Sequence, residues 1–336
     1  MAKFFLKKDY KSPLDIMETE IAIKALKDFF ERSLSENLNL TRVSAPLFVF
    51  PESGLNDDLN GVERPVSFGI LEQNDKECEI VHSLAKWKRN ALKKYGFGVG
   101  SGLYTDMNAI RRDEETDNTH SLYVDQWDWE KVISKEDRTT AFLKETVKKI
   151  YKALLETEKY INEKYACLSK KLPDEIFFIT SQELLDLYPD LSSKERENAL
   201  LKDKKAAFIM EIGTKLSNGE KHDGRAPDYD DWTLNGDIML YNPILESAFE
   251  ISSMGIRVDE KALESQLKTA NCEDRKGLKF HSDLLSGNLP LTIGGGIGQS
   301  RLCMFYLDKL HIGEVHSSVW TKETMEICVK NGINLL

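Results

Sequence analysis

The sequence predicts an α+β fold, in which an antiparallel sheet is flanked by helices. Several short segments alternate apolar and polar residues, as strands do, and turn sequences typical of hairpins lie near them. Longer segments with apolar residues three and four positions apart predict amphipathic helices between these strands. Because these segments are spread over the whole chain and no linker or internal repeat divides it, we expect residues 1–336 to form a single domain.

The first helix is expected to begin near Ser12, with Pro13 in the first turn and Asp15 completing an S-x-x-D capping box. It should end near residues 37–39, and residues 41–50 should continue as an extended segment around a proline. The apolar residues that we expect on its buried face are Leu14, Met17, Ile21, Ala25 and Phe29.

Two further helices are expected at residues 83–96, where Gly96 ends the pattern, and at residues 139–165. Residues 121–130 alternate and are rich in aromatic side chains, which predicts a strand. Further strands are expected at 77–81, 176–180, 206–212, 237–241 and 248–258, with turns at 217–219, 223–224 and 235–236.

Three polar residues follow one another at alternate positions of the predicted strand 121–130. Gln126, Asp128 and Glu130 therefore share one face, and the two tryptophans between them share the other. This polar face is either exposed to solvent or part of a binding site. Arg111, which opens an Arg-Arg-Asp-Glu run just upstream, has the side chain best suited to a phosphate or carboxylate ligand, although such runs are also common on solvated surfaces.

A glycine-rich segment spans Gly294 to Gly298 and is followed by Arg301 and an apolar, helix-like run. It matches neither the Walker A pattern nor G-x-G-x-x-G. The glycines either let the backbone approach a flat ligand closely or form a tight turn that packs against the following helix.

Acidic side chains predict a second cluster. Asp237 and Glu250 lie on adjacent predicted strands, and Ser252 and Ser253 lie near them. Because Mg²⁺ is usually held by one or two carboxylates together with substrate phosphates, we expect these residues to form a magnesium site beside a triphosphate. The acidic loop 225–232 is either a hydrated surface loop or the source of a carboxylate that binds a substrate ammonium group.

Composition argues against several classes of function. The formal net charge of −10 disfavours a surface that binds nucleic acid. The apolar runs are too short to span a bilayer, and the first residues lack the apolar core of a signal peptide. Five scattered cysteines, none in a C-x-x-C pair, predict neither a disulfide framework nor a clustered zinc site and suit a cytoplasmic protein.

These signals, taken in order, resemble the three signature motifs of class II aminoacyl-tRNA synthetases. Residues 12–46 look like motif 1, the element that forms the dimer, residues 111–130 look like motif 2, and residues 294–301 look like motif 3. The resemblance therefore implies the antiparallel catalytic domain of that class and a homodimer.

The aspartyl and asparaginyl subgroup of these synthetases is the most similar one. Its pocket has a serine and a lysine five residues apart, as Ser83 and Lys88 are here. It also has a glutamate followed seven residues later by an arginine, as Glu250 and Arg257 are here.

Longer phrases resemble the asparagine synthetase A family, whose members are ammonia-dependent. These phrases are VHSLAKWKR (81–89), YVDQWDWE (123–130), RAPDYDDW (225–232), SSMGIRV (252–258) and IGGGIGQSRL (293–302). The resemblance runs from about residue 5 to the C-terminus. The chain departs from the family pattern at Asp58, where an asparagine is expected after Asp57, and in a shorter connection at residues 232–234.

This resemblance implies a two-step reaction. The β-carboxylate of aspartate attacks the α-phosphorus of ATP and gives β-aspartyl-AMP and diphosphate. Ammonia then attacks the acyl carbon and releases asparagine and AMP. The implied substrates are aspartate, ATP and ammonia, and the implied cofactor is Mg²⁺.

The resemblance also implies a role for individual residues. Arg111 would bridge the α-phosphate and the activated carboxylate, and Arg301 would contact the adenine and γ-phosphate side. Lys88 and Arg257 would bind the α-carboxylate of aspartate. The other expected residues are Asp57, Asp230 and Gln126 at the ammonium and ammonia site, Ser83, Asp128, Ser252 and Ser253 for substrate, His120, Ser121, Glu250 and Gly298 for the nucleotide, and Asp237 with Glu250 for Mg²⁺.

Two other functions remain as alternatives. An aspartyl- or asparaginyl-tRNA synthetase would carry an anticodon-binding β-barrel before motif 1, and here motif 1 begins near residue 12, so we expect no such domain. A catalytically inactive regulatory protein would have lost the motif arginines, whereas Arg111 and Arg301 are both present.

Glutamine as nitrogen donor would require a nucleophile such as an N-terminal cysteine, and the chain begins Met-Ala-Lys, so we expect free ammonia.

Overall fold

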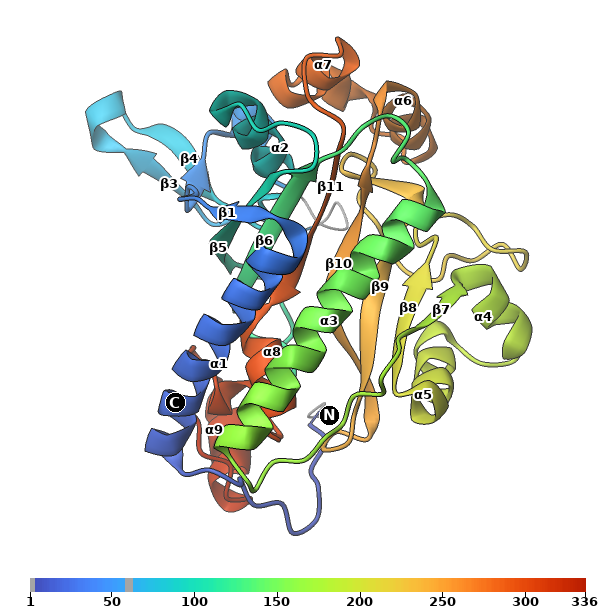
Figure 1. The fold of residues 1–336 in the computed structure, drawn as a ribbon. Coiled ribbons are helices and arrows are strands. Elements are labelled where there is room, and N and C mark those ends of the chain that lie inside the picture. The colour runs from blue at the N-terminus through green and yellow to red at the C-terminus, as the bar shows by residue number, and fades with distance from the viewer. Residues whose placement is uncertain (1–3, 58–62) are drawn as a thin grey trace.

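The computed structural model describes residues 4–57 and 63–336, and an eight-stranded sheet forms its centre (Figure 1). Neighbouring strands from β5 through β8 are antiparallel, whereas the pairs at the two edges, β1–β5 and β7–β8, are parallel. In spatial order the strands are β1 (Leu40–Arg42), β5 (Gly102–Ile110), β6 (Tyr123–Val132), β11 (Thr292–Gly298), β10 (Ser247–Arg257), β9 (Asp230–Asn242), β8 (Ala206–Met210) and β7 (Phe177–Thr180). The α+β fold with a mainly antiparallel sheet is therefore confirmed.

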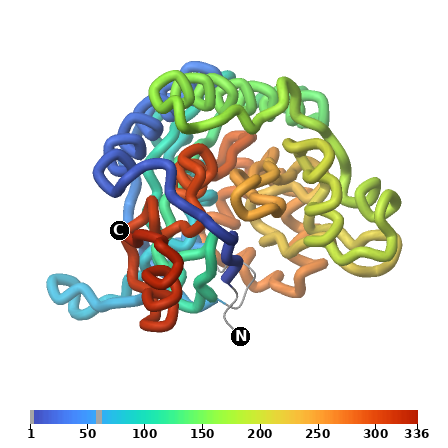
Figure 2. The backbone as a smooth tube through the Cα atoms, turned by 90° about the horizontal axis from the view of Figure 1, so that it is seen from below, coloured from blue at the N-terminus to red at the C-terminus, as the bar shows by residue number. Residues whose placement is uncertain are grey.

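Two long helices, α1 (Ile16–Leu38) and α3 (Thr140–Lys164), pack against each other and form a layer over one face of this sheet (Figures 1 and 2). The shorter helix α8 (Gln299–Tyr306) follows β11 directly. A small sheet of β2 (Phe48–Val49), β4 (Lys76–Ile80) and β3 (Ser67–Ile70) carries a hairpin that projects from the body in both views. The remaining helices are α2 (Ala85–Tyr95), α4 (Ser181–Leu187), α5 (Ser193–Lys204), α6 (Glu260–Thr269), α7 (Lys279–Leu285) and α9 (Lys322–Lys330), and the 3₁₀ turns are η1 (Pro51–Ser53), η2 (Leu71–Gln73), η3 (Glu273–Gly277) and η4 (Ile312–Glu314).

The start of α1 and its buried face both differ from the prediction. Asp15 is the N-cap and forms a capping box with Glu18, so the cap lies three residues after Ser12 and the helix begins at Ile16. Of the predicted stripe, Leu14 is buried, but Met17 and Ile21 are exposed, so the stripe is not the core face of the helix. The core face of the helix instead carries Ala22, Leu26, Phe30, Leu34 and Leu38, which repeat every four residues.

The alternation along β6 is confirmed. Trp127 and Trp129 are fully buried in the core beneath α1 and α3, and the Trp127 ring lies 4.8 Å from that of Phe30. Because side chains alternate along a strand, Gln126 and its neighbours two residues away must project from the opposite face of the sheet.

The turn predicted at residues 235–236 was wrong, and the tight turn left open as one alternative for residues 294–298 is excluded. Asn235-Gly236 does not form a turn but lies inside β9, where a Cβ on Gly236 would be 2.4 Å from the carbonyl oxygen of Ile209. The segment from Gly294 to Gly298 is the strand β11, not a turn. Strand β5 was not predicted, since its sequence does not alternate clearly, whereas the helices expected at 83–96 and 139–165 are present as α2 and α3.

No helix in the described parts of the chain combines the length and the apolar character needed to cross a membrane. The departure noted at Asp58 lies outside the described residues.

Candidate active site

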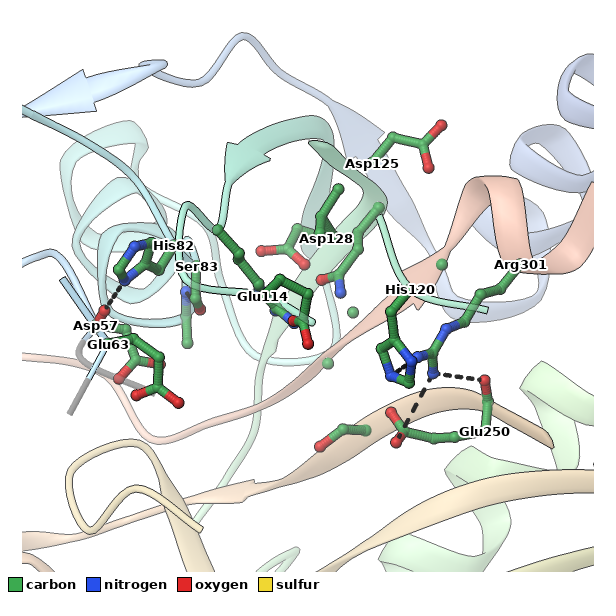
Figure 3. Close-up of a pocket in the computed structure, with 18 of the residues that line it drawn as sticks. Asp57, Glu63, His82, Ser83, Glu114, His120, Asp125, Asp128, Glu250 and Arg301 are labelled. Atoms are coloured by element: carbon green, nitrogen blue, oxygen red, sulfur yellow. Dashed lines mark hydrogen bonds and ion pairs between the residues drawn. The ribbon is translucent and has the colours of Figure 1, made fainter. Parts of the chain in front are cut away.

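A cavity of about 400 Å³ lies on the face of the sheet opposite α1 and α3. All of the predicted site residues except Asp237 and Ser252 line it. Figure 3 shows two separate groups of side chains in this pocket: Asp57, Glu63, His82 and Ser83 lie at one end, and His120, Glu250 and Arg301 lie at the other. The predicted residues in the lining are Asp57, Ser83, Lys88, Arg111, His120, Ser121, Gln126, Asp128, Asp230, Glu250, Ser253, Arg257, Gly298 and Arg301.

The glycines of β11 make room for the polar side chains of β6. The two strands pair so that Gly294 is opposite Glu130 and Gly296 is opposite Asp128. A Cβ on Gly294 would lie 1.9 Å from Oε2 of Glu130, and one on Gly296 would lie 2.3 Å from Oε1 of Gln126. These distances are far below van der Waals contact, so only glycine at both positions permits the polar side chains to lie across β11.

A buried network of charges forms the floor of the pocket. Arg257 makes paired hydrogen bonds to Glu130, with Nη2 2.7 Å from Oε2, and its Nη1 lies 2.5 Å from Oδ1 of Asp230. Lys88, from α2, donates to the carbonyl oxygen of Gly295 at 2.9 Å, and its Nζ lies 3.4 Å from Oδ2 of Asp128. Two cations are therefore held beside three carboxylates, and burial makes their interactions stronger than in water.

This environment shifts the proton affinities of the network. Burial lowers the pKa of Lys88. The positive charge of Arg257 lowers this pKa further, whereas the carboxylates of Asp128 and Glu130 raise it and offset only part of the shift. Burial raises the pKa of Asp230, and its pairing with Arg257 offsets only part of that effect. Burial alone would raise the pKa of Glu130 as well, but Arg257 and Lys88 outweigh it and leave this pKa below its ordinary value.

Basic side chains dominate the other end of the pocket. Arg301 reaches from α8 to the carbonyl oxygen of Glu250 at 3.1 Å, and its Nη2 lies 3.0 Å from Nε2 of His120. The other ring nitrogen of His120 lies 2.9 Å from Oδ1 of Asp117, so the ring is held from both sides. Arg111 closes the β5–β6 hairpin, and its Nε is buried with no hydrogen-bond partner in the described part of the chain. Such an arginine is available to an anionic ligand.

A bulge in β10 decides which acidic side chains face the same way. Glu250 pairs with Met239 and Ser253 pairs with Asp237, with a register shift between residues 250 and 252. Residues three apart would normally face opposite sides, and the extra residue brings Glu250, Ser253 and Asp237 to one face. Ser252, by contrast, pairs with Ile238 and faces the other side, where it does not line the pocket.

Asp237 is paired with a cation from the acidic loop. Nη2 of Arg225 lies 2.5 Å from its Oδ1. Burial, together with the charge of Glu250, raises the pKa of Asp237 despite this partner. A further cation would relieve that repulsion, so the two carboxylates fit a magnesium seat that also uses substrate phosphates. In the described ranges no cluster of three or more histidine, cysteine or acidic residues is placed to hold a metal on its own.

Among the lining residues to which sequence reasoning gave no role are His82, Arg225 and Tyr229. Nδ1 of His82 lies 2.9 Å from the carbonyl oxygen of Asp57, and because a carbonyl only accepts, this nitrogen carries the proton. The Tyr229 ring lies 5.7 Å from the guanidinium of Arg257. These residues lie within the family-like phrases at 81–89 and 225–232, but nothing in their spacing shows which side chains face inward.

Comparison with known proteins gives a consistent result. The family model described as aspartate-ammonia ligase matches residues 17–332. The chain belongs to the aspartate–ammonia ligase family. A relative from Clostridium tetani named aspartate–ammonia ligase is 62% identical over 334 residues, covering 99% of this chain and 98% of the relative. One from Fusobacterium nucleatum with the same name is 64% identical over 327 residues, covering 97% and 99%.

The solved structures similar to this member of the aspartate–ammonia ligase family include asparaginyl- and aspartyl-tRNA synthetases. Asparaginyl-tRNA synthetase from Entamoeba histolytica, in complex with asparaginyl-adenylate, has a TM-score of 0.63 at 12% identity over 93% of this chain and 71% of that one. The Pyrococcus horikoshii enzyme, complexed with asparaginyl-adenylate, has a TM-score of 0.58 at 14% identity, covering 89% and 68%. At such identities the likeness concerns the fold, and the class II synthetase-like catalytic domain is confirmed.

Proposed function

We propose that this protein is an ammonia-dependent asparagine synthetase that converts L-aspartate, ATP and ammonia into L-asparagine, AMP and diphosphate. The family to which the chain belongs supports the reaction. The pocket supports the mechanism, because one continuous cavity joins a buried ionic network suited to an amino acid to an arginine-rich end suited to a nucleotide. A β-aspartyl-AMP intermediate would lie across both ends.

In the first step, the β-carboxylate of aspartate attacks the α-phosphorus of ATP and displaces diphosphate. Two anions must approach each other, so positive charge and in-line positioning matter more than proton transfer. We assign Arg111 to the α-phosphate and the attacking carboxylate, and Arg301 to the adenine and γ-phosphate side. His120, Ser121 and Gly298 complete the nucleotide end.

Aspartate is held by its other end, since the β-carboxylate must remain free to react. We assign Lys88 and Arg257 to its α-carboxylate. Both are buried and both already contact carboxylates, which fixes their positions. Ser83 and Asp128 line the same part of the pocket.

In the second step, ammonia attacks the acyl carbon of the intermediate and AMP leaves. We assign Asp57, Asp230 and Gln126 to the ammonium group and the incoming ammonia. Asp57 and Asp230 are buried carboxylates in the pocket lining, and buried negative charge attracts a small cation such as ammonium.

Mg²⁺ would be held by Asp237 and Glu250, with Ser253 beside the same phosphate. The shared face of these side chains and the repulsion between the two carboxylates support this site. When bound, the ion neutralises part of the triphosphate charge. Ser252 faces away from the pocket, so we assign it no contact with substrate.

We also propose a cytoplasmic homodimer of single-domain subunits that binds no nucleic acid. Exposed apolar side chains on α1, among them Met17 and Ile21, support pairing through this helix. Five free cysteines suit a reducing compartment, and the net charge of −10 disfavours tRNA. The single domain is supported by the central sheet, whose strands come from residues 40 to 298.

The decisive experiment measures AMP and asparagine produced from ATP, aspartate and ammonium chloride without tRNA. Asparagine should form with ammonium and not with glutamine, and its rate at fixed total ammonium should rise with pH through the neutral range, because only unprotonated ammonia is a nucleophile. Equal rates with glutamine, or AMP formation that requires tRNA, would refute the assignment.

A further inference from the structure

A buried carboxylate at the edge of the pocket joins three segments that are distant in the sequence. Asp125 lies on β6 next to Gln126, and in Figure 3 it projects away from Asp128, as residues three apart on a strand do. Asp125 lines the edge of the pocket together with Ser300, and its carboxylate is held by α1 and α8. Asp125 has no part in the mechanism described above.

The hydrogen bonds of Asp125 fix the first turn of α8. Its Oδ1 accepts the backbone N–H of Ser300 at 3.0 Å, and its Oδ2 accepts the Ser300 hydroxyl at 2.8 Å. Nζ of Lys27, from α1, lies 2.9 Å from the same Oδ2. Nδ1 of His316 approaches the Ser300 hydroxyl to 2.7 Å, and its Nε2 lies 3.0 Å from the carbonyl oxygen of Tyr123.

This arrangement acts on Arg301 through its neighbour in the chain. Ser300 and Arg301 are the second and third residues of α8, so holding Ser300 sets the point from which the arginine side chain extends. From there the guanidinium donates hydrogen bonds to the carbonyl oxygen of Glu250 and to Nε2 of His120, at the nucleotide end. A shift of the first turn of α8 would move the guanidinium away from both partners.

We propose that Asp125 is a positioning residue for ATP: without touching the nucleotide, it fixes the start of α8 and hence Arg301. Lys27 and Ser300 hold the carboxylate from α1 and α8, so the segments 12–46, 111–130 and 294–301 meet at this one side chain. The inference rests on the assignment of Arg301 to the nucleotide in the proposed function.

The test compares Asp125→Asn with the wild type by calorimetric titration of ATP, without aspartate or ammonium. Asparagine at this position leaves one oxygen for the Ser300 N–H but turns an N–H₂ toward Lys27 and the Ser300 hydroxyl. Because a displacement of about 1 Å can cost up to about 10²-fold, we expect the Kd for ATP to rise about tenfold, while the KM for aspartate changes less than about twofold.

Asp228 provides a matched control, since it is another buried carboxylate that contacts several basic side chains. Its Oδ2 lies 3.2 Å from Nζ of Lys86, 3.1 Å from Nη1 of Arg275 and 2.9 Å from Nε2 of His281. These partners lie on α2, η3 and α7, not on α8. Asp228→Asn should lower the melting temperature, because the loss of a buried carboxylate destabilises the fold wherever it lies. It should leave the Kd for ATP within about twofold, because none of its partners lies on α8.

Two smaller substitutions extend the test in case Asp125→Asn does not fold. Ser300→Ala and Lys27→Met each remove one hydrogen bond to Asp125, and each should raise the Kd for ATP about threefold, in line with one lost bond of modest net strength. Unchanged ATP affinity in all the variants that fold, or an equal loss in Asp228→Asn, would overturn the proposal. Because titration needs no turnover, a wild type that binds ATP but makes no asparagine would refute the proposed activity while leaving this comparison valid.

Discussion

The carboxylate of Glu130 lies directly over Gly294, so closely that a Cβ on this glycine would be 1.9 Å from Oε2. Glu130 is held there by paired hydrogen bonds from Arg257 and by the Thr292 hydroxyl, which donates to Oε1 at 2.7 Å. The glycine run therefore does not bend the chain. It provides the space in which the ionic floor of the aspartate end is built.

Gly294→Ala should weaken aspartate binding and the fold together. The new methyl group would also lie 2.7 Å from Nη2 of Arg257, so both members of the buried pair must move. Overpacking of this kind costs about 1–3 kcal/mol, and we expect a melting temperature several degrees lower. Because misplaced binding groups lose affinity steeply, the KM for aspartate should rise at least about tenfold.

The matched control for this substitution is Gly98→Ala, since a Cβ on Gly98 would meet nothing within 4 Å. Thermal unfolding and steady-state kinetics of both variants provide the measurement. An aspartate KM for Gly294→Ala equal to that of Gly98→Ala would show that Glu130 and Arg257 do not shape the aspartate end.

Arg111→Ala should lower turnover by at least about 10²-fold, because it removes a fixed positive group beside the reacting phosphate. Its effect should fall on kcat, measured as asparagine formed at saturating aspartate and ATP, while the circular dichroism spectrum stays unchanged. Lys322, on α9, is exposed and does not line the pocket, and Lys322→Ala should stay within about twofold of the wild type, as surface substitutions generally do. A kcat for Arg111→Ala close to that of Lys322→Ala would contradict the assigned role.

Much of the site could be predicted because it lies on regular elements whose sequence shows which residues share a face. The alternation of β6 predicted both the buried tryptophans and the polar residues opposite them. The spacing of Ser83 and Lys88, at the start of α2, resembled that of two pocket residues in the related synthetases, and both residues line the pocket here. Resemblance to known motifs then indicated which of these polar residues belong to one pocket.

Other features depend on contacts that sequence spacing does not encode. The bulge in β10 reverses the alternation between Glu250 and Ser253, so the sequence alone could not show that Ser252 faces away from the pocket. The glycines of β11 are explained only by the side chains that lie across them from β6. Likewise, both faces of α1 carry apolar residues, so their spacing alone does not show which face is buried in the core.

The exposed apolar residues of α1 give a prediction about assembly. Met17 and Ile21, four residues apart on one side of α1, are 67% and 58% exposed, and together they form an apolar surface that a second subunit can cover. If α1 pairs with its copy in a second subunit, Ile21→Glu should convert the dimer into a monomer, because it places a charge in each half of a two-fold interface. Light scattering should then give a mass near 38.4 kDa for the variant and twice that for the wild type.

Met325 on α9 is 45% exposed, and Met325→Glu therefore serves as the control for a charge introduced at an exposed apolar position elsewhere. It should leave the mass unchanged. A wild-type protein that scatters as a monomer at micromolar concentration would rule out the homodimer.

The last prediction concerns acid stability and rests on His311, at the start of η4. This residue is fully buried, its Nδ1 accepts the backbone N–H of Gly313 at 3.0 Å, and its ring packs 4.8 Å from that of Trp320. Burial lowers its pKa to about 4, whereas an unfolded chain would titrate near the ordinary value of 6.5. Between these two values the unfolded state binds the proton and the folded state does not, so stability falls as the pH decreases from 6.5 toward 4.

The shift of His311 corresponds to a loss on the order of 3 kcal/mol across that interval. In His311→Asn, the side-chain oxygen can still accept the N–H of Gly313, but no titrating group remains. The variant should therefore unfold at a lower temperature at pH 7, because the ring packing is lost, yet show a shallower fall in stability between pH 6.5 and 4. Chemical denaturation at a series of pH values measures both slopes. If stability falls with pH equally steeply in the two proteins, then other groups cause the acid sensitivity and His311 does not contribute to it.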